Sequence, residues 1–221
     1  MARTPRVVED RREHIIDAAL RVFAEKGYTR ATNRDIAHEA GITTGLIYYY
    51  FQSKEDLLKA VLETRSPLQV MAEISPEMLE QPPETLLFVL VIRLLSLVES
   101  EPFVSVVRVM LSEMLHGASE VAPIARDFVL RVIGFLSEYF KRQVASGNVR
   151  SDLDVTTTAQ VFTSCMVGMV MRRQILRDTS VLQYSHEELA LAILNPFLQG
   201  IKKEADYGIG DQGTGAGQVV R

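Results

Sequence analysis

The sequence predicts an all-α protein with a small N-terminal helix-turn-helix domain of three to four helices, joined to a larger helical domain. Three observations predict this fold class. Apolar residues recur at helical spacing through most of the 221 residues. Capping residues and glycines mark the points where successive helices begin and end. No segment combines alternating β-branched residues with hairpin turn residues, so we expect no sheet.

The first predicted helix runs from about residue 8 to residue 26. Its apolar residues fall at positions 15, 16, 19, 20, 22 and 23, which is the spacing of one buried helical face. Gly27 follows its end, where glycine commonly stands.

The most distinctive motif in the chain covers about residues 32–51. Thr32 is the predicted N-cap of a second helix, and Asp35 stands three residues later as its capping-box partner. Gly41 ends that helix, because glycine enters the left-handed conformation without steric cost. Thr43 then caps a third helix. Two short helices joined by a tight turn are typical of a helix-turn-helix, whose second helix fits a DNA major groove. The same arrangement also occurs in ordinary helical bundles.

Three consecutive tyrosines, Tyr48, Tyr49 and Tyr50, lie on this third helix and cannot all be core residues. Each helical residue advances about 100° around the axis, so at least one ring points away from the packed face. We expect that ring to meet something outside the monomer. Tyr48 or Tyr50 could instead pack against Phe23 and Phe51 to hold the head together.

Ser53 is the predicted N-cap of a fourth helix, and Pro67 and Pro76 punctuate the connector that follows it. The remaining predicted helices cover residues 84–99, 103–116, 123–146, 155–177 and 186–203. The boundaries of these predicted helices suggest a DNA-binding domain at 1–66 with an arm at 1–7, and a larger helical domain at 67–203. The Gly-rich tail at 204–221 we expect to be disordered.

Composition and charge limit the possible functions. The net charge of −4 is unevenly spread, because residues 1–65 hold 11 Lys and Arg against 10 Asp and Glu, and the rest holds 13 against 18. This distribution fits a DNA-reading head on an acidic body. The single cysteine, Cys165, excludes a disulfide framework, and its apolar neighbours predict a buried thiol. With no evident signal peptide or membrane span, we expect a cytoplasmic protein with no membrane partner.

The segments AEKGY and ATNRDIAHEAGITTGLIYYYFQSKEDLL resemble the DNA-binding head of the tetracycline-repressor family of bacterial regulators, over roughly residues 12–62. The segment ASGNVRSDLD is similar to the junction that often precedes the family's last dimerisation helices. The resemblance implies a homodimeric regulator, most often a repressor, whose larger domain binds a ligand and dimerises. It implies a palindromic double-stranded DNA operator, release by a small and largely apolar effector through a change in the tilt of the fourth helix, and no cofactor.

The resemblance also implies which residues contact DNA. Arg34 matches a position often aimed at a guanine or a phosphate, and Lys54 matches a phosphate-binding lysine. Tyr50 departs from the pattern, because the family commonly has histidine there. The implied DNA-contacting residues are Asn33, Arg34, Thr43, Thr44, Gly45, Tyr48, Tyr49, Tyr50 and Lys54. Arg34 could alternatively pair with Asp35 or Glu39. Four arginines near the N-terminus could form an arm that touches the minor groove or phosphates: Arg3, Arg6, Arg11 and Arg12. A frayed terminus is the simpler interpretation.

The second part of the chain should supply a ligand pocket and a dimer interface. Small residues that permit close helix packing are the candidate interface: Gly134, Ser164 and Gly168. Contacts within one monomer would explain them equally well. Arg93 stands out within an apolar helix, because a buried guanidinium requires a partner. The candidate pocket residues are Arg93, Phe103, Val107, Met110, Met114, Phe162, Met166 and Met169.

An enzyme is the competing class of protein. The four histidines, at 14, 38, 116 and 186, lack metal-ligand spacing. The best candidate catalytic group is Arg93, Glu113 and His116, but nothing identifies a nucleophile, so we expect no catalysis and no metal site. A helical protein-interaction module that uses the motif for packing is the other alternative, and salt-sensitive DNA binding would distinguish a regulator from it.

Overall fold

The computed structural model describes residues 5–65, 67–115 and 121–202 and is helical throughout. Within these ranges no strand is present, and the predicted all-α class is confirmed. Most of the expected arm at 1–7 and the expected tail at 204–221 lie outside the described residues. The helices are α1 (Pro5–Lys26), α2 (Asn33–Glu39), α3 (Thr44–Tyr50), α4 (Lys54–Thr64), α5 (Pro67–Ala72), α6 (Pro76–Leu79), α7 (Pro83–Val98), α8 (Glu101–Leu115), α9 (Val121–Ala145), α10 (Val155–Val170), α11 (Thr179–Leu182) and α12 (His186–Ile201).

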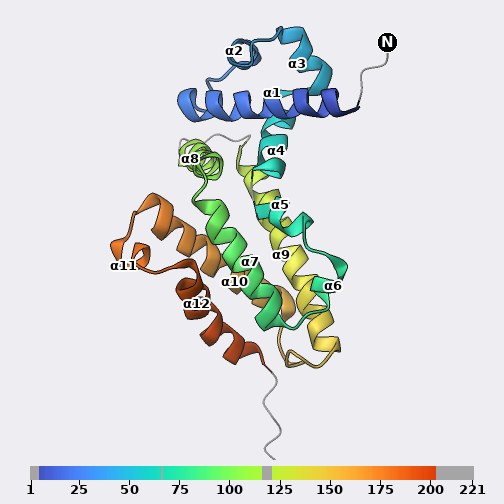
Figure 1. The fold of residues 1–221 in the computed structure, drawn as a ribbon, viewed down its shortest axis with the longest axis vertical. Coiled ribbons are helices and arrows are strands. Elements are labelled where there is room, and N and C mark those ends of the chain that lie inside the picture. The colour runs from blue at the N-terminus through green and yellow to red at the C-terminus, as the bar shows by residue number, and fades with distance from the viewer. Residues whose placement is uncertain (1–4, 66, 116–120, 203–221) are drawn as a thin grey trace, which may run out of the picture.

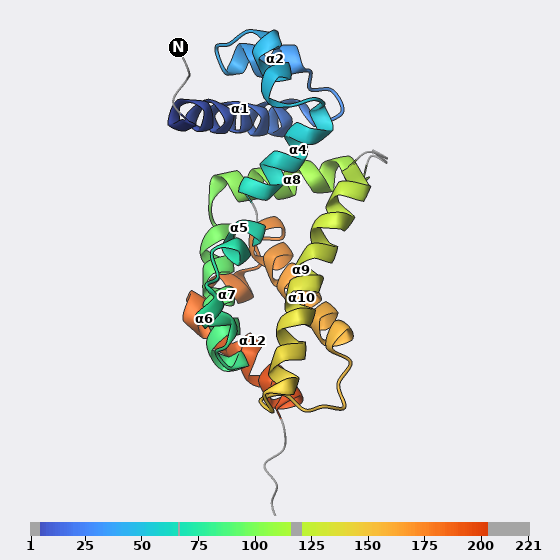
Figure 2. The ribbon, with the colours of Figure 1, turned by 90° about the vertical axis from the view of Figure 1, so that its right-hand side faces the viewer.

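The helices form a small head and a longer body (Figure 1 and Figure 2). In the head, α2 and α3 lie on the outer side of α1, and α4 leads from the head toward the body. Helix α8 lies directly beneath α1, and the two helices are in contact. Below them, α7, α9, α10 and α12 pack as the long helices of the body, with α10 against α9 and α12 against α7.

The apolar core of the head does not end at the head. The apolar face predicted for the first helix is buried, and Ile15 and Ile16 are almost wholly enclosed. The same buried cluster continues into α8 through Val106, Val109 and Met110. Helix α8 therefore completes the core of the head while belonging to the body.

A second buried cluster joins the long helices of the body. Two polar side chains of α9 tie it to the segment between α6 and α7: the Tyr139 hydroxyl donates to the Gln81 carbonyl at 2.8 Å, and Gln143 Nε2 donates to the same oxygen at 3.1 Å. Burial raises the pKa of the Tyr139 phenol, so this donor keeps its proton. None of the described helices is long and apolar enough to cross a membrane.

The body differs from the predicted pattern at two points. The helix expected over 155–177 is α-helical only to Val170 and continues as a π-helical turn over Met171–Ile175. Cys165 is exposed rather than buried, so the expectation of a buried thiol was wrong. Its side chain lies outside the buried side of α10, which holds Phe162 and Met166.

Candidate DNA-binding surface and ligand cavity

The start of α2 is fixed by the predicted capping box. Thr32 Oγ1 accepts a hydrogen bond from the Asp35 backbone N–H at 3.2 Å, and Asp35 Oδ2 accepts one from the Thr32 N–H at 3.0 Å. Lys26 Nζ lies 2.7 Å from Asp35 Oδ1. Lys26, followed by the Thr32 hydrogen bonds, holds the pKa of Asp35 well below its usual range. The end of α1 is thereby tied to the start of α2.

The turn between α2 and α3 has the predicted geometry. Gly41 adopts a left-handed conformation with φ of 62°. The next N–H, of Ile42, donates to the Ala37 carbonyl at 2.9 Å. Ile36 in α2 and Ile47 in α3 are both fully buried, so each short helix is anchored by one isoleucine. These contacts fix the direction in which α3 leaves the turn.

The three tyrosines of α3 divide as helical geometry requires. Tyr48 and Tyr49 are 58% and 72% exposed. Tyr50 is half-buried and packs against the core of the head, and its ring meets that of Tyr49 edge-on with 5.1 Å between centroids. Two phenol rings therefore stand open on the outer edge of the head, where α3 lies in Figure 1.

The first turn of α3 is also open. Thr43 is exposed, and its hydroxyl makes no capping hydrogen bond, while Thr44 is half-buried. A Cβ atom added to Gly45 would meet no described atom within 4 Å. Packing within the described chain thus gives no reason for glycine at this position, whereas the close approach of a DNA backbone would supply one.

Arg34 lies exposed near the start of α2. The two carboxylates that could have paired with it are occupied, because Asp35 binds Lys26 and Glu39 binds Arg21 at 2.6 Å. Arg34 forms no ion pair within the described ranges. Beside it, Asn33 Oδ1 is buried and accepts no hydrogen bond from any described residue.

Lys54 points into the protein. Its ammonium donates to the backbone carbonyls of Tyr28 at 2.9 Å, Ala31 at 3.1 Å and Thr29 at 3.4 Å. It also lies 4.4 Å from the centroid of the Tyr28 ring, within cation–π range. Lys54 thus closes the loop between α1 and α2, a structural role that sequence reasoning missed because it depends on where that loop passes.

The N-terminal arginines are only partly described. Arg3 lies outside the described residues, and the side chain of Arg6 is among those the structure does not describe. Arg11 is exposed, while the guanidinium of Arg12 lies 5.2 Å from the Phe51 ring centroid. Arg12 therefore packs on the head.

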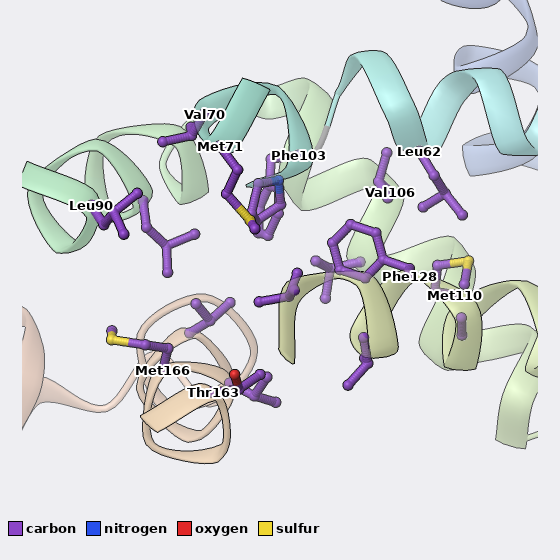
Figure 3. A pocket seen from close by; sticks show the side chains of 18 of the residues that line it. Leu62, Val70, Met71, Leu90, Phe103, Val106, Met110, Phe128, Thr163 and Met166 are labelled. Carbon is purple, nitrogen blue, oxygen red and sulfur yellow. The ribbon is translucent and has the colours of Figure 1, made fainter. Parts of the chain in front are cut away.

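A cavity of about 280 Å³ lies beneath the head, between α4, α5, α7, α8, α9 and α10 (Figure 3). Among the residues that the structure describes, its wall is apolar apart from one threonine, Thr163 on α10. Among the described residues that line it are Leu62, Val70, Met71, Leu90, Phe103, Val106, Val107, Met110, Phe128, Phe162, Thr163 and Met166.

Five of the predicted pocket residues line this cavity: Phe103, Val107, Met110, Phe162 and Met166. Met169 instead packs against the core of the body. Arg93 is exposed on α7, where it lies 3.7 Å from Glu73, so it is neither buried nor part of the cavity wall. The side chain of Met114 is not described.

Sequence reasoning missed the contributions of α5 and α9 to the wall, such as Met71 and Phe128. Met71 reaches the cavity because α5 packs against α7, and Phe128 reaches it because α9 packs against α8 and α10. No local sequence signal reports this packing.

The candidate interface residues lie on the surface. Gly134, Ser164 and Gly168 are all exposed, and a Cβ added to either glycine would meet no described atom within 4 Å. Packing within the described chain therefore does not account for these glycines. Large apolar side chains are exposed on the same helix as Gly168 and on α12: Val161, Val167 and Leu191.

The candidate catalytic group is not assembled. Glu113 is buried and bonded to Thr29, Arg93 lies on the surface beside Glu73, and His116 falls outside the described residues. No group of three potential metal ligands comes together in the described part of the chain.

Comparison with known proteins places this geometry in context. The family model described as "Bacterial regulatory proteins, tetR family" matches residues 15–61. The chain is 29% identical over 173 residues to the HTH-type transcriptional regulator SrpR of Pseudomonas putida, which covers 77% of this chain and 78% of SrpR. It is 50% identical over 64 residues to the regulator HbdR of Aromatoleum sp., which covers 27% of this chain and 28% of HbdR.

Among solved structures, the SmeT–triclosan complex superposes with a TM-score of 0.71 at 22% identity, covering 88% of this chain and 93% of that one. SmeT is the repressor of the Stenotrophomonas maltophilia multidrug efflux pump SmeDEF. This likeness shows the fold. The named relatives are transcriptional regulators, which confirms the expectation that the chain is not an enzyme.

The exposure of the tyrosines leads to a first prediction. Replacing Tyr48 or Tyr49 by Ala should weaken DNA binding by about 10-fold or more, the effect of losing one hydrogen bond to a charged phosphate. Stability should change by no more than about 0.5 kcal/mol, because both side chains are exposed. Tyr50→Ala should instead lower the free energy of unfolding by about 1–3 kcal/mol. Gel-shift titration and urea denaturation measure the two effects, and unchanged binding by the Tyr48/Tyr49 double variant would contradict this assignment.

The contacts of Lys54 lead to a second prediction. Lys54→Ala should lower the free energy of unfolding by about 1–3 kcal/mol, because it leaves carbonyls of the α1–α2 loop without their donor. Lys59→Ala is the matched control on the same helix, since Lys59 is exposed. The salt dependence of DNA binding should stay the same, because the donors of Lys54 already face the loop. If the slope of log binding constant against log salt concentration became shallower by about one, Lys54 would instead neutralise a phosphate.

Proposed function

We propose that this protein, which belongs to the tetR family of bacterial regulatory proteins, represses transcription as a homodimer on a palindromic operator and is released by a small, largely apolar effector. The observation that carries the proposal is the apolar cavity under the head, whose wall is built partly from helices that also hold the head. Because its partner would be chromosomal DNA, we place the protein in the cytoplasm.

The DNA-reading part of the proposal rests on α3. The helix is short, its first turn is open, and two exposed tyrosines stand on its outer side. Hydroxyl groups and free N–H groups at such a position suit phosphate contacts, and the apolar ring faces suit thymine methyl groups. Arg34 at the start of α2 offers an exposed guanidinium that pairs with no carboxylate of the described residues.

The dimer part rests on an uncovered face of the body. Val161, Ser164 and Gly168 are exposed on one side of α10 by their helical spacing, and Leu191 is exposed on α12. A second copy that packs on this face would bury the apolar side chains and use the space at the glycine. Two heads placed about one helical turn of DNA apart would then read the two halves of a palindrome.

The release mechanism rests on two helices that touch both the cavity and the head. Helix α8 supplies Met110 to the cavity wall, and its Glu113, only 6% exposed, binds the head. Glu113 Oε2 accepts a hydrogen bond from Thr29 Oγ1 at 2.5 Å, and Oε1 accepts one from the Thr29 N–H at 3.3 Å. Helix α4 supplies Leu62 to the wall and Lys54 to the same loop.

A ligand that displaces α4 or α8 would therefore move the loop that leads into α2. The shift would change the position of α3, and with it the fit of the dimer to successive major grooves. Such a ligand lowers operator affinity only as far as it binds the displaced arrangement more tightly than the DNA-bound one. SmeT, a repressor with this fold, forms a complex with triclosan, which supports a small-molecule effector for this protein as well.

Selection of bound sequences from a random DNA pool tests the proposed function. We expect a palindrome whose half-sites lie about 10 base pairs apart, bound by a species that sedimentation shows to be a dimer. Triclosan, used as a probe effector, should weaken binding to the selected DNA in a gel shift. Recovery of no consensus sequence, or binding by a monomer to a single half-site, would contradict the proposal.

The Glu113 contact yields a more specific prediction. Glu113→Gln should change the affinity for triclosan by no more than about twofold. An effector typically changes the affinity of a coupled site by about 5–150-fold, and this variant should reduce the triclosan-induced loss of operator affinity several-fold. The amide replaces a charged acceptor by a neutral one, so the head is held less firmly to α8. Glu101→Gln, at an exposed position on the same helix, is the matched control and should respond like the parent protein. Equal responses of the two variants would show that Glu113 carries no coupling.

A further inference from the structure

The cavity wall restricts the chemistry of what it can hold. Among the described residues that line the cavity, every side chain is aliphatic, aromatic or a methionine except that of Thr163. A charged ligand group would find no opposite charge in this wall, and burying an unpaired charge costs far more free energy than burying an apolar group. The wall therefore favours uncharged molecules.

Thr163 differs from three other helical residues whose hydroxyl groups have a partner within their own helix. Thr64, Ser137 and Thr158 each donate to the carbonyl four residues earlier, at 2.8, 2.7 and 2.8 Å. The equivalent carbonyl for Thr163 is that of Ala159, four residues earlier in α10. Thr163 Oγ1 nevertheless has no hydrogen-bond partner among the described residues.

The Thr163 side chain is also enclosed, being only 8% exposed. Figure 3 shows it on α10 at one side of the cavity, with Phe103 on the opposite side. Buried hydroxyl groups are rarely left without a partner, because the lost hydrogen bonds to water are not replaced. The Thr163 side chain lines an otherwise apolar cavity, and its Oγ1, which is itself buried, has to turn about χ1 to reach a molecule bound there.

We propose that Thr163 is the single polar anchor of the cavity and that the effector is an uncharged, mostly apolar molecule with one hydroxyl or carbonyl group. This inference rests on the proposed function, because it assigns a ligand class to the same cavity. The hydroxyl of Thr163 donates to or accepts from that one group, while the apolar remainder of the molecule fills the space between α8 and α10. Threonine in a helix has two accessible χ1 rotamers, so its oxygen can turn toward a bound group.

The cavity volume limits the size of the ligand. An engineered apolar cavity of about 150 Å³ holds one benzene molecule. The present cavity, at about 280 Å³, has roughly twice that space, which corresponds to a molecule of about two rings. A naphthalene skeleton is therefore a suitable probe.

Three probes of equal skeleton test the inference by calorimetric titration of the full chain at neutral pH. We expect 1-naphthol to bind about 5–10-fold more tightly than naphthalene, as one buried neutral hydrogen bond would produce, and 1-naphthoate to bind most weakly. Thr163→Val removes the hydroxyl and keeps the shape of the side chain. It should abolish the preference for 1-naphthol and leave naphthalene affinity unchanged.

Thr158→Val is the matched control, because Thr158 lies on the same helix with its hydroxyl bonded to the Asp154 carbonyl and outside the cavity wall. This variant should keep the preference for 1-naphthol. If the Thr163→Val variant also keeps the preference for 1-naphthol over naphthalene, or if 1-naphthoate binds as tightly as 1-naphthol, the inference is overturned while the proposed effector site stands. If none of the probes binds the parent protein, the inference and the proposed effector cavity both fail.

Discussion

The loop between α1 and α2 is the part of the structure on which both halves of the molecule depend. Lys54 from α4 binds three of its carbonyls, and Glu113 from α8 binds Thr29 at its centre. Gly27 at its start adopts φ of 79°, and a Cβ there would lie 2.8 Å from Glu113 Oε1. The backbone conformation favours glycine there, and a Cβ would in addition push the Glu113 carboxylate away from its present position. A loop of a few residues thus connects the helix that begins the DNA-reading motif to α4 and α8, two of the helices that line the cavity.

The local signals in the sequence identified the head well. Thr32, Asp35 and Gly41 behave as their residue types predict, because capping and left-handed turns are decided by residues a few positions apart. The division of the tyrosines follows from the helical repeat alone, with Tyr48 and Tyr49 outside and Tyr50 partly packed. Such features need no knowledge of the rest of the fold.

The features that the sequence did not reveal depend on which helices face each other. Lys54 resembled a phosphate-binding residue and instead points into a loop that lies 23–26 residues earlier in the chain. Arg93 and Cys165 stand among apolar residues in sequence, yet both lie on outward helix faces. Glu113 was considered for catalysis, whereas its carboxylate connects the body to the head. Polar residues in apolar segments are informative, but their partners come from tertiary packing.

Two kinds of contact join α8 to the head, and their physical difference suits a switch. Val106, Val109 and Met110 extend the apolar core of the head, and Met110 also lines the cavity. Apolar contacts of this kind tolerate small displacements, because burial changes little and methionine adapts its shape. The hydrogen bonds between Glu113 and Thr29, at 2.5 and 3.3 Å, do not, since a shift of about 1 Å takes the longer one out of range and the shorter one to its limit. In the proposed release mechanism, a ligand beside Met110 would therefore move α8 without unpacking the head, while the polar contact would pass from formed to broken. The apolar core would keep the two halves together, and the carboxylate would make the change discrete.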